Sequence, residues 1–197
     1  MLRTKPNPVE VDMEELRDEE LMEMFCSGRT EAFQVLFDKY KNRIFRFIYG
    51  AYEKNPSQVE DYTQEVFLRV IKKRDTFNPA MRFSTWLFTI ARNYCLNQIR
   101  AKSANLEVQV ESMDRLMYSK PGSDASEKLL DKELGALIRR SVARLPENLR
   151  AVFVLREIDG LSHGEISEIL NLRESNVREK GYSSEVMNFN SRKFTIA

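Results

Sequence analysis

Apolar residues recur at intervals of three and four along most of the chain, and this spacing predicts amphipathic helices. The clearest example covers residues 30–51, where basic residues fill the opposite side of the predicted helix. Its apolar positions are Phe33, Leu36, Phe37, Tyr40, Ile44, Phe47, Ile48 and Ala51. Thr30 is suited to cap this helix, and Gly28 to end a shorter helix before it. That earlier stretch, residues 10–23, is rich in Asp and Glu, and a solvated acidic face is its favoured interpretation.

A third helix is predicted after Asn55-Pro56, because Ser57 and Glu60 have the spacing of a capping box. Its apolar side consists of Val59, Tyr62, Val66, Val70 and Ile71. Another side gathers Asp61, Gln64, Glu65 and Leu68 at steps of three and four. This side has two interpretations on the pattern alone. An ordinary solvated face is favoured, and the exposed leucine indicates a docking surface for a partner.

Residues 77–102 form a stretch without a single acidic residue, in a chain of which 31% is charged. Basic and aromatic residues alternate within it: Arg82, Arg92, Arg100 and Lys102 with Phe77, Phe83, Trp86, Phe88 and Tyr94. Cations bind phosphates and aromatic rings stack on bases, so this composition suits a single nucleic-acid strand.

A helix is predicted within this stretch from Ser84, which would cap it, with Phe83 and Phe88 as a hydrophobic staple. The buried arc of this helix holds Leu87, Phe88, Ile90, Ala91, Tyr94, Cys95 and Ile99. The opposite arc holds Thr89, Arg92, Asn93, Asn97 and Arg100, with Trp86 and Leu96 beside it. Amides and guanidiniums on one face suit contacts with base edges and phosphates. For Trp86, a place in the core and a place in strand binding are equally favoured.

Residues 103–125 lose helical periodicity and are interpreted as a linker. Fully extended, its 23 residues reach about 75 Å at about 3.3 Å per residue. That length corresponds to about 22 base pairs of duplex at about 3.4 Å per pair. The linker is therefore long enough to hold two DNA-binding units on one duplex.

The C-terminal part predicts three further helices and the start of a fourth. Apolar spacing indicates helices over residues 126–145 and 146–158, the second burying Val152, Phe153, Leu155 and Ile158. Asp159-Gly160 forms a turn, and a short helix follows from Ser162, with a capping box completed by Glu165 and a staple of Leu161 and Ile166. Asn171 suits a left-handed turn before a helix that begins near Glu174. A short helix, a tight turn and a second helix make a helix-turn-helix pattern.

Composition narrows the function classes. The chain has 197 residues, 42% of them hydrophobic, and a net charge of +1, which is ordinary for a soluble globular protein. Cys26 and Cys95 are isolated and His163 is the only histidine, so we expect neither a zinc site nor a histidine-based catalytic triad. A nuclease would need clustered carboxylates, and no further acid joins Asp61 and Glu65. We expect no catalytic residue, metal, cofactor or small-molecule substrate, no signal peptide or membrane span, and a reducing, cytoplasmic location.

Three motifs, in this order, resemble the bacterial RNA polymerase sigma factors, most closely the extracytoplasmic-function (ECF) group. They are DYTQEVFLRV (61–70), FSTWLFTIARN (83–93) and LPENLRAVFVLREIDGLSHGEISEILNL (145–172). The resemblance implies an all-α fold of two small helical domains, a three- or four-helix bundle and a helix-turn-helix, joined by a flexible linker. The expected domains are an acidic segment (1–29), a region 2-like domain (30–102), the linker (103–125), a region 4-like domain (126–180) and a divergent tail (181–197).

The resemblance also implies partners and roles for residues. Such a protein binds core RNA polymerase and promoter DNA, directs DNA opening at initiation, and is commonly held by an anti-sigma factor, often at the membrane. Asp61, Gln64, Glu65 and Leu68 match the contact with core polymerase, which reverses the solvated interpretation of that face. Residues matching the element that opens and binds one promoter strand are Phe77, Asn78, Arg82, Phe83, Ser84, Trp86, Arg92, Asn93, Asn97 and Arg100. Duplex binding farther upstream would fall to Ser175, Asn176, Arg178 and Lys180.

The sequence departs from the family pattern after Val177. Gly181 stands where a leucine is usual, and a tail rich in Ser and Asn follows, so the last helix is expected to end near Lys180. A divergent end and a shifted reading frame both explain this tail, and the second is slightly favoured. The alternative function is therefore a non-initiating sigma-like module with an incomplete DNA-recognition helix. A plain helix-turn-helix repressor leaves the first 102 residues without a role.

Overall fold

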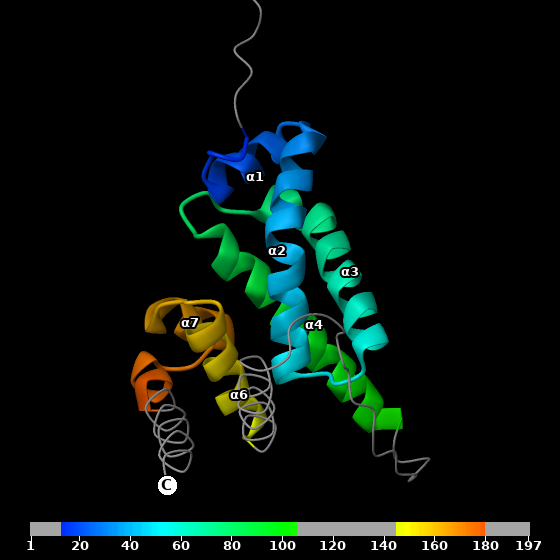
Figure 1. Cartoon of the computed structure of the whole chain (residues 1–197), viewed down its shortest axis with the longest axis vertical. Helices are drawn as coiled ribbons and strands as arrows, with labels where there is room; N and C mark the ends of the chain where they lie inside the picture. Colours follow the sequence, from blue (N-terminus) through cyan, green and yellow to red (C-terminus); the bar gives the residue numbers. More distant parts are fainter. Residues whose placement is uncertain (1–12, 106–144, 180–197) are drawn as a thin grey trace, which may run out of the picture.

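The computed structural model describes residues 13–105 and 145–179, and every regular element in these two ranges is helical (Figure 1). The predicted all-α class is thereby confirmed. Residues 13–105, the N-terminal unit, contain α1 (Asp18–Cys26), α2 (Thr30–Ala51), α3 (Pro56–Lys73), the 3-10 turn η1 (Arg74–Thr76) and α4 (Phe83–Asn105). Residues 145–179, the C-terminal unit, contain α6 (Glu147–Phe153), the π-helical η3 (Val154–Ile158) and α7 (His163–Leu170), and residues 174–179 are again helical.

Helix α2 is the centre of the N-terminal unit, and α1, α3 and α4 pack against it (Figure 1). Its apolar face is buried as the spacing predicts, with Leu36, Ile44, Phe47 and Ile48 fully excluded from solvent. Phe47 meets the ring of Phe88 edge to face, with their centroids 5.2 Å apart. Such aromatic pairs add about 0.5–1.5 kcal/mol beyond the area they bury. The core therefore fixes α4, which carries the predicted strand-binding face, directly to α2.

Two predicted helix caps on α2 and α3 are wrong. Thr30 is the first residue of α2 and Arg29 stands at the cap position, without a side-chain bond to the helix. Helix α3 is capped by Asn55, whose Oδ1 accepts hydrogen bonds from the backbone N–H groups of Ser57 (3.1 Å) and Gln58 (3.4 Å). Pro56 explains the difference, because proline lacks an N–H and favours the first helical position, which makes the residue before it the cap.

The predicted cap of α4 is also wrong, because this helix begins at Phe83 and Ser84 lies buried in its first turn. The backbone N–H of Phe83 donates instead to Glu19 Oε1, at 2.9 Å. A carboxylate from α1 therefore satisfies one of the free N–H groups at this helix start. Phe83 and Phe88 are both fully buried, although Phe83 lies inside the helix rather than before it.

The turns of the C-terminal unit follow the sequence closely. Ser162 and Glu165 form the predicted capping box: Ser162 Oγ accepts from the Glu165 N–H (3.3 Å) and the Ser162 N–H donates to Glu165 Oε2 (2.8 Å). Gly160 has φ +69° and Asn171 has φ +49°, so both adopt the left-handed conformation. Leu161 and Ile166 are buried, as expected for a staple.

Two isoleucines expected in the core are exposed. Ile158 is 48% exposed because residues 154–158 form a π-helix, in which the Asp159 N–H bonds to the Val154 carbonyl at 3.1 Å. The wider turn of a π-helix shifts the following side chains out of the phase that α-helical spacing predicts. Ile71 is 38% exposed near the end of α3, close to the side that carries Leu68.

The C-terminal unit lies against the N-terminal unit, with α7 packed on α4, and α6 and η3 packed on α2 (Figure 1). The approach is closest at Gly50, where an added Cβ would lie 2.6 Å from Val154 Cγ2. The predicted linker, the helix over residues 126–145 apart from Leu145, and the tail lie outside the described residues. Within the described ranges, no helix combines the length and the apolar character needed to cross a membrane.

Candidate nucleic-acid interface

The four predicted polymerase-binding residues lie together on the outer side of α3. Asp61, Gln64 and Leu68 are exposed, and the Glu65 side chain retains 41% of its surface. Leu68 is 46% exposed, and Ile71, one helical turn on, is also exposed, so two large apolar side chains lie together on this surface. The apolar spacing predicts a buried Ile71, although its distance of three residues from Leu68 also indicates this exposed face. Together these residues form a surface that combines acidic side chains with two exposed apolar ones, which lie toward the C-terminal end of α3.

The predicted strand-binding loop is built on an aromatic cluster at the start of α4. The ring centroid of Phe77 lies 5.3 Å from that of Trp86 and 6.1 Å from that of Phe83. Phe83 is fully buried, whereas Phe77 and Trp86 are half-buried at the edge of the core. Phe83 and the buried Ser84 therefore support the site from beneath, and Phe77 and Trp86 present ring surface to solvent.

Asn78 shapes the loop between the aromatic residues. Its Oδ1 accepts from the Ala80 N–H at 3.0 Å, and its carbonyl accepts from the Met81 N–H at 2.9 Å. These bonds close a tight turn after Phe77 and leave Met81 and Arg82 exposed. Asn78 thus acts on the conformation of the loop, and the following residues present their side chains outward.

The polar side of α4 forms as the wheel predicts. Asn93, Asn97 and Arg100 are exposed, and Arg92 is half-buried, with its Nη1 donating to Asn93 Oδ1 at 3.2 Å. Arg82 extends the basic character to the loop, and its side chain is 75% exposed. Its Nε lies 3.5 Å from Glu165 Oε1 in the C-terminal unit. The structure therefore brings the predicted strand-binding residues onto α4 and the loop before it.

The predicted duplex-binding residues lie on the helical segment 174–179. Ser175, Asn176 and Arg178 are exposed, while Val177 is fully buried and anchors the segment. Arg178 Nη2 lies 2.7 Å from Glu174 Oε1 one turn earlier. Lys180 lies outside the described residues.

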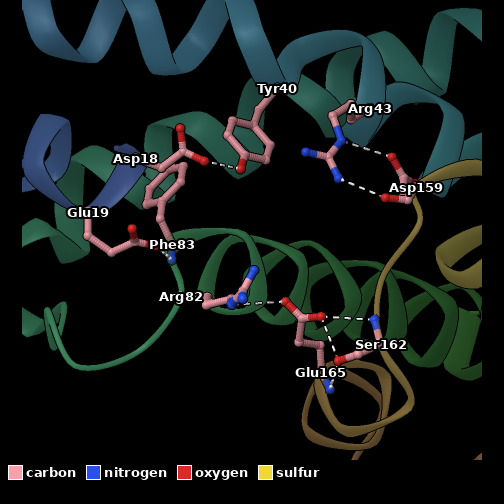
Figure 2. A network of polar contacts seen from close by, with 9 residues as sticks. All are labelled: Asp18, Glu19, Tyr40, Arg43, Arg82, Phe83, Asp159, Ser162 and Glu165. Atoms are coloured by element: carbon pink, nitrogen blue, oxygen red, sulfur yellow. Dashed lines mark hydrogen bonds and ion pairs between the residues drawn. The ribbon is translucent and has the colours of Figure 1, made fainter. Parts of the chain in front are cut away.

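The acidic segment does more than present a solvated face, which corrects that interpretation for Asp18 and Glu19. Asp18 pairs with Lys39 Nζ at 2.5 Å. It also accepts a hydrogen bond from the Tyr40 hydroxyl (Figure 2). Burial, together with this bond to Asp18, raises the pKa of Tyr40. Since Glu19 bonds to the start of α4, α1 helps to position the loop that precedes this helix.

Two arginines of α2 form a second basic group, and the sequence pattern does not distinguish them from the other basic residues of that helix. Arg43 Nε donates to Asp159 Oδ1 at 3.0 Å and its Nη2 to the Asp159 carbonyl at 3.3 Å, while Arg46 Nη2 lies 4.0 Å from Oδ1. The Asp159 side chain is wholly excluded from solvent. Burial raises the pKa of its carboxyl, and the bond from Arg43 opposes this rise. Its position after a helix, in an Asp-Gly turn, gave no signal of such a role.

Comparison with known proteins matches both halves of the chain. The Sigma-70 region 2 model matches residues 36–105, and the Sigma-70, region 4 model matches residues 136–180. The ECF RNA polymerase sigma factor SigW of Bacillus subtilis (strain 168) is 35% identical over 159 residues, which cover 78% of this chain and 84% of SigW. The chain belongs to the ECF sigma factor family. The ECF sigma-E factor of Escherichia coli (strain K12) is 30% identical over 173 residues, covering 85% of this chain and 90% of that protein.

The fold of this family is also present among solved structures. The sigma factor RpoE of Bartonella quintana, in a complex with the anti-sigma factor NepR, superposes with a TM-score of 0.68 at 17% identity. The superposition covers 82% of this chain and 96% of that one. The family and fold inferred from the three motifs are therefore confirmed.

Proposed function

We propose that the protein binds core RNA polymerase, gives it promoter specificity and helps to open promoter DNA. Membership of the ECF sigma factor family carries this proposal. Its sequence matches both the region 2 and the region 4 models, and we assign one promoter element to each region. The protein has no catalytic chemistry of its own in this role, and it acts in the cytoplasm.

The polymerase contact is assigned to the face of α3 that carries Asp61, Gln64, Glu65 and Leu68, extended by Ile71. Exposed apolar side chains next to acidic ones fit the composition of protein interfaces, in which apolar side chains are buried and charged ones select the partner. Leu68 and Ile71 support this assignment, because they are exposed in the protein alone and would be buried by a partner.

Strand opening is assigned to the loop before α4 and the polar face of that helix. Removing a base from the stack costs a few kcal/mol, and stacking on an aromatic side chain returns about 1–3 kcal/mol per base. Phe77 and Trp86 offer half-exposed rings for this purpose. Arg92 and Arg100 lie on the same helix and would bind phosphates, while Asn93 and Asn97 would contact base edges.

Duplex binding is assigned to the segment that begins at residue 174, as the second helix of the helix-turn-helix. Ser175, Asn176 and Arg178 are exposed there, and Lys180 continues the set beyond the described residues. The alternative of a non-initiating module depended on the tail, which lies outside the described residues, and no comparison favours it.

An anti-sigma factor is the further partner that we propose. The Bartonella quintana relative was solved in a complex with the anti-sigma factor NepR. Such a partner would hold the protein away from polymerase until a signal releases it.

The proposal is tested by probing promoter opening with permanganate, which oxidises unpaired thymines. The protein and core polymerase are incubated together and separately with genomic fragments. We expect clustered reactive thymines only when both are present. The opening function would be contradicted if the protein binds core polymerase but no thymine becomes reactive when both are present.

A further inference from the structure

The two units are fastened by arginines that contact groups of the opposite unit. Arg43 of α2 bonds to Asp159 (3.0 Å), and Arg82 pairs with Glu165 (3.5 Å) (Figure 2). Arg150 of α6 donates from Nε and Nη2 to the Ala51 carbonyl, at 3.2 and 3.0 Å. In the first two contacts, an arginine of the N-terminal unit forms an ion pair with a carboxylate of the C-terminal unit.

A single cleft joins the first two contacts. Arg43, Arg82, Asp159 and Glu165 all line it, and its volume is about 720 Å³. Asp18 and Glu19 of α1 also line the cleft, but Asp18 is paired with Lys39 and Tyr40, and Glu19 is bonded to the Phe83 N–H. Arg43 and Arg82 therefore face one continuous space, which opens beside the loop that precedes α4. Guanidinium groups bind carboxylates and phosphates with the same planar geometry, so the site that holds these carboxylates is suited to phosphates.

The carboxylates are imperfectly satisfied where they lie. Asp159 Oδ2 and Glu165 Oε1 are buried without a hydrogen-bond partner. The pair of Arg82 with Glu165 is partly exposed, since the Arg82 side chain keeps 75% of its surface, and such pairs contribute little to stability. The buried Asp159 carboxylate loses less when it returns to water than a fully bonded one would, because one of its oxygens has no hydrogen bond to give up. Both carboxylates are therefore suited to exchange for another anion.

We propose that Arg43 and Arg82, with Arg46 beside them, form a phosphate-binding site for the opened promoter strand. Asp159 and Glu165 occupy this site in the closed arrangement and take the place of two phosphates. The inference rests on the proposed function, because it assigns the strand as the ligand. It adds residues of α2 to the strand-binding surface, and it makes closure of the two units compete with DNA binding.

Closure also conflicts with the use of both units on one promoter. The C-terminal unit is assigned to an element farther upstream than the one bound by α4. Two units whose side chains meet at 3.5 Å cannot occupy separated elements of a duplex together. Binding of the DNA strand at Arg82 therefore favours release of the C-terminal unit, and release of this unit favours strand binding.

The test measures binding of the full chain to a labelled single-stranded DNA of about 12 nucleotides, by fluorescence anisotropy without polymerase. Glu165→Gln removes the carboxylate that pairs with Arg82. Glu168→Gln makes the same change of net charge at an exposed position on the same helix and is the control. We expect Glu165→Gln to bind about fivefold more tightly than Glu168→Gln, a fold-change within reach of a partly exposed ion pair. Arg43→Gln, added to Glu165→Gln, should reverse the gain.

A second variant opens the interface without altering any charge. Gly50→Ala places a Cβ against Val154 in the interface, and alanine is a better helix former than glycine, so α2 is retained. We expect a larger radius of gyration in small-angle X-ray scattering and tighter DNA binding. If circular dichroism shows that Glu165→Gln is unfolded, the DNA affinity of Gly50→Ala tests the proposal instead.

Equal DNA affinity of Glu165→Gln and Glu168→Gln would overturn the proposal, as would an expanded Gly50→Ala that binds no more tightly than the parent chain. Permanganate reactivity with core polymerase is measured in parallel on the parent chain. If thymines are still reactive, only the proposal of a masked phosphate site is contradicted. If no thymine is reactive, the proposed function itself is contradicted.

Discussion

Arg43 Nε donates a 3.0 Å hydrogen bond to Asp159 Oδ1 across 116 residues of sequence. This bond ties the middle of α2 to the turn between η3 and α7, and Arg43 also bonds to the backbone carbonyl of Asp159. The Arg43 guanidinium is positioned by aromatic rings, lying 4.8 Å from the centroid of Tyr40 and 5.6 Å from that of Phe88. The core of the N-terminal unit therefore sets where the helix-turn-helix docks.

Arg43→Met should separate the two units. The change leaves the buried Asp159 carboxylate without its main partner, and breaking such a pair typically costs about 3–5 kcal/mol. Opening the interface returns the carboxylate to water, so we expect a larger radius of gyration in X-ray scattering at neutral pH. Lys41→Met is the matched control, because Lys41 is an exposed cation of α2 that pairs with Asp38 on the same helix. A chain as compact as this control would contradict the prediction.

Leu68→Ser and Ile71→Ser should each weaken binding to core polymerase. Burying a partly exposed leucine or isoleucine in an interface stabilises the complex by about 1–2 kcal/mol, so we expect roughly a tenfold loss of affinity for each. Folding should be unaffected, since both side chains are already exposed. Lys73→Ser, on another side of the same helix, is the control in a surface plasmon resonance titration. An effect of equal size at position 73 would argue against a defined docking face.

Trp86→Ala and Glu65→Ala should affect different steps. Trp86 lies beside Phe77 at the start of α4, whereas Glu65 lies on the outer side of α3. We expect Trp86→Ala to reduce permanganate-detected opening about tenfold while leaving polymerase affinity within a factor of two, as the loss of one stacked base implies. Glu65→Ala should do the reverse, and Trp86→Phe should retain part of the opening. Equal losses of both properties in both alanine variants would refute this division.

The two cysteines should differ sharply in reactivity. Cys95 is fully buried, and burial raises the pKa of its thiol to about 12, so its reactive thiolate is absent at neutral pH. Cys26 is exposed, although partial burial raises its pKa as well. A disulfide reagent at pH 8 should label one thiol in the native chain and the second only on unfolding. Cys26→Ser should abolish the native reaction, and rapid labelling of that variant would contradict the described core.

Helical periodicity predicted the apolar faces well, because each face is fixed by residues three and four apart. Leu36, Ile44 and Phe47 on α2, and Leu87 and Ala91 on α4, are buried as expected. Helix starts were less predictable, because several residues compete for each cap. Asn55 takes the position assigned to Ser57, and α4 begins at Phe83, whose N–H bonds to Glu19 of α1. The second case depends on tertiary contact, which no local pattern contains.

In the candidate site too, features set by local spacing were predictable and features set by packing between distant segments were not. Asp61, Gln64, Glu65 and Leu68 share a face because their spacing is local, and the structure brings them together. The exposure of Ile158 depends on a π-helix, and the pairing of Arg43 with Asp159 depends on how two units dock. Neither has a signature in the sequence, since both arise from packing between distant segments.

Mapping of transcript 5′ ends tests the central claim most directly. Purified core polymerase transcribes fragmented genomic DNA with and without the protein, and the 5′ ends of the transcripts are sequenced. We expect a set of 5′ ends that appears only with the protein and shares two sequence elements at a fixed separation upstream. Leu68→Ser should lose these ends, and Lys73→Ser should keep them. Binding of the protein to core polymerase without any protein-dependent 5′ end would contradict the account.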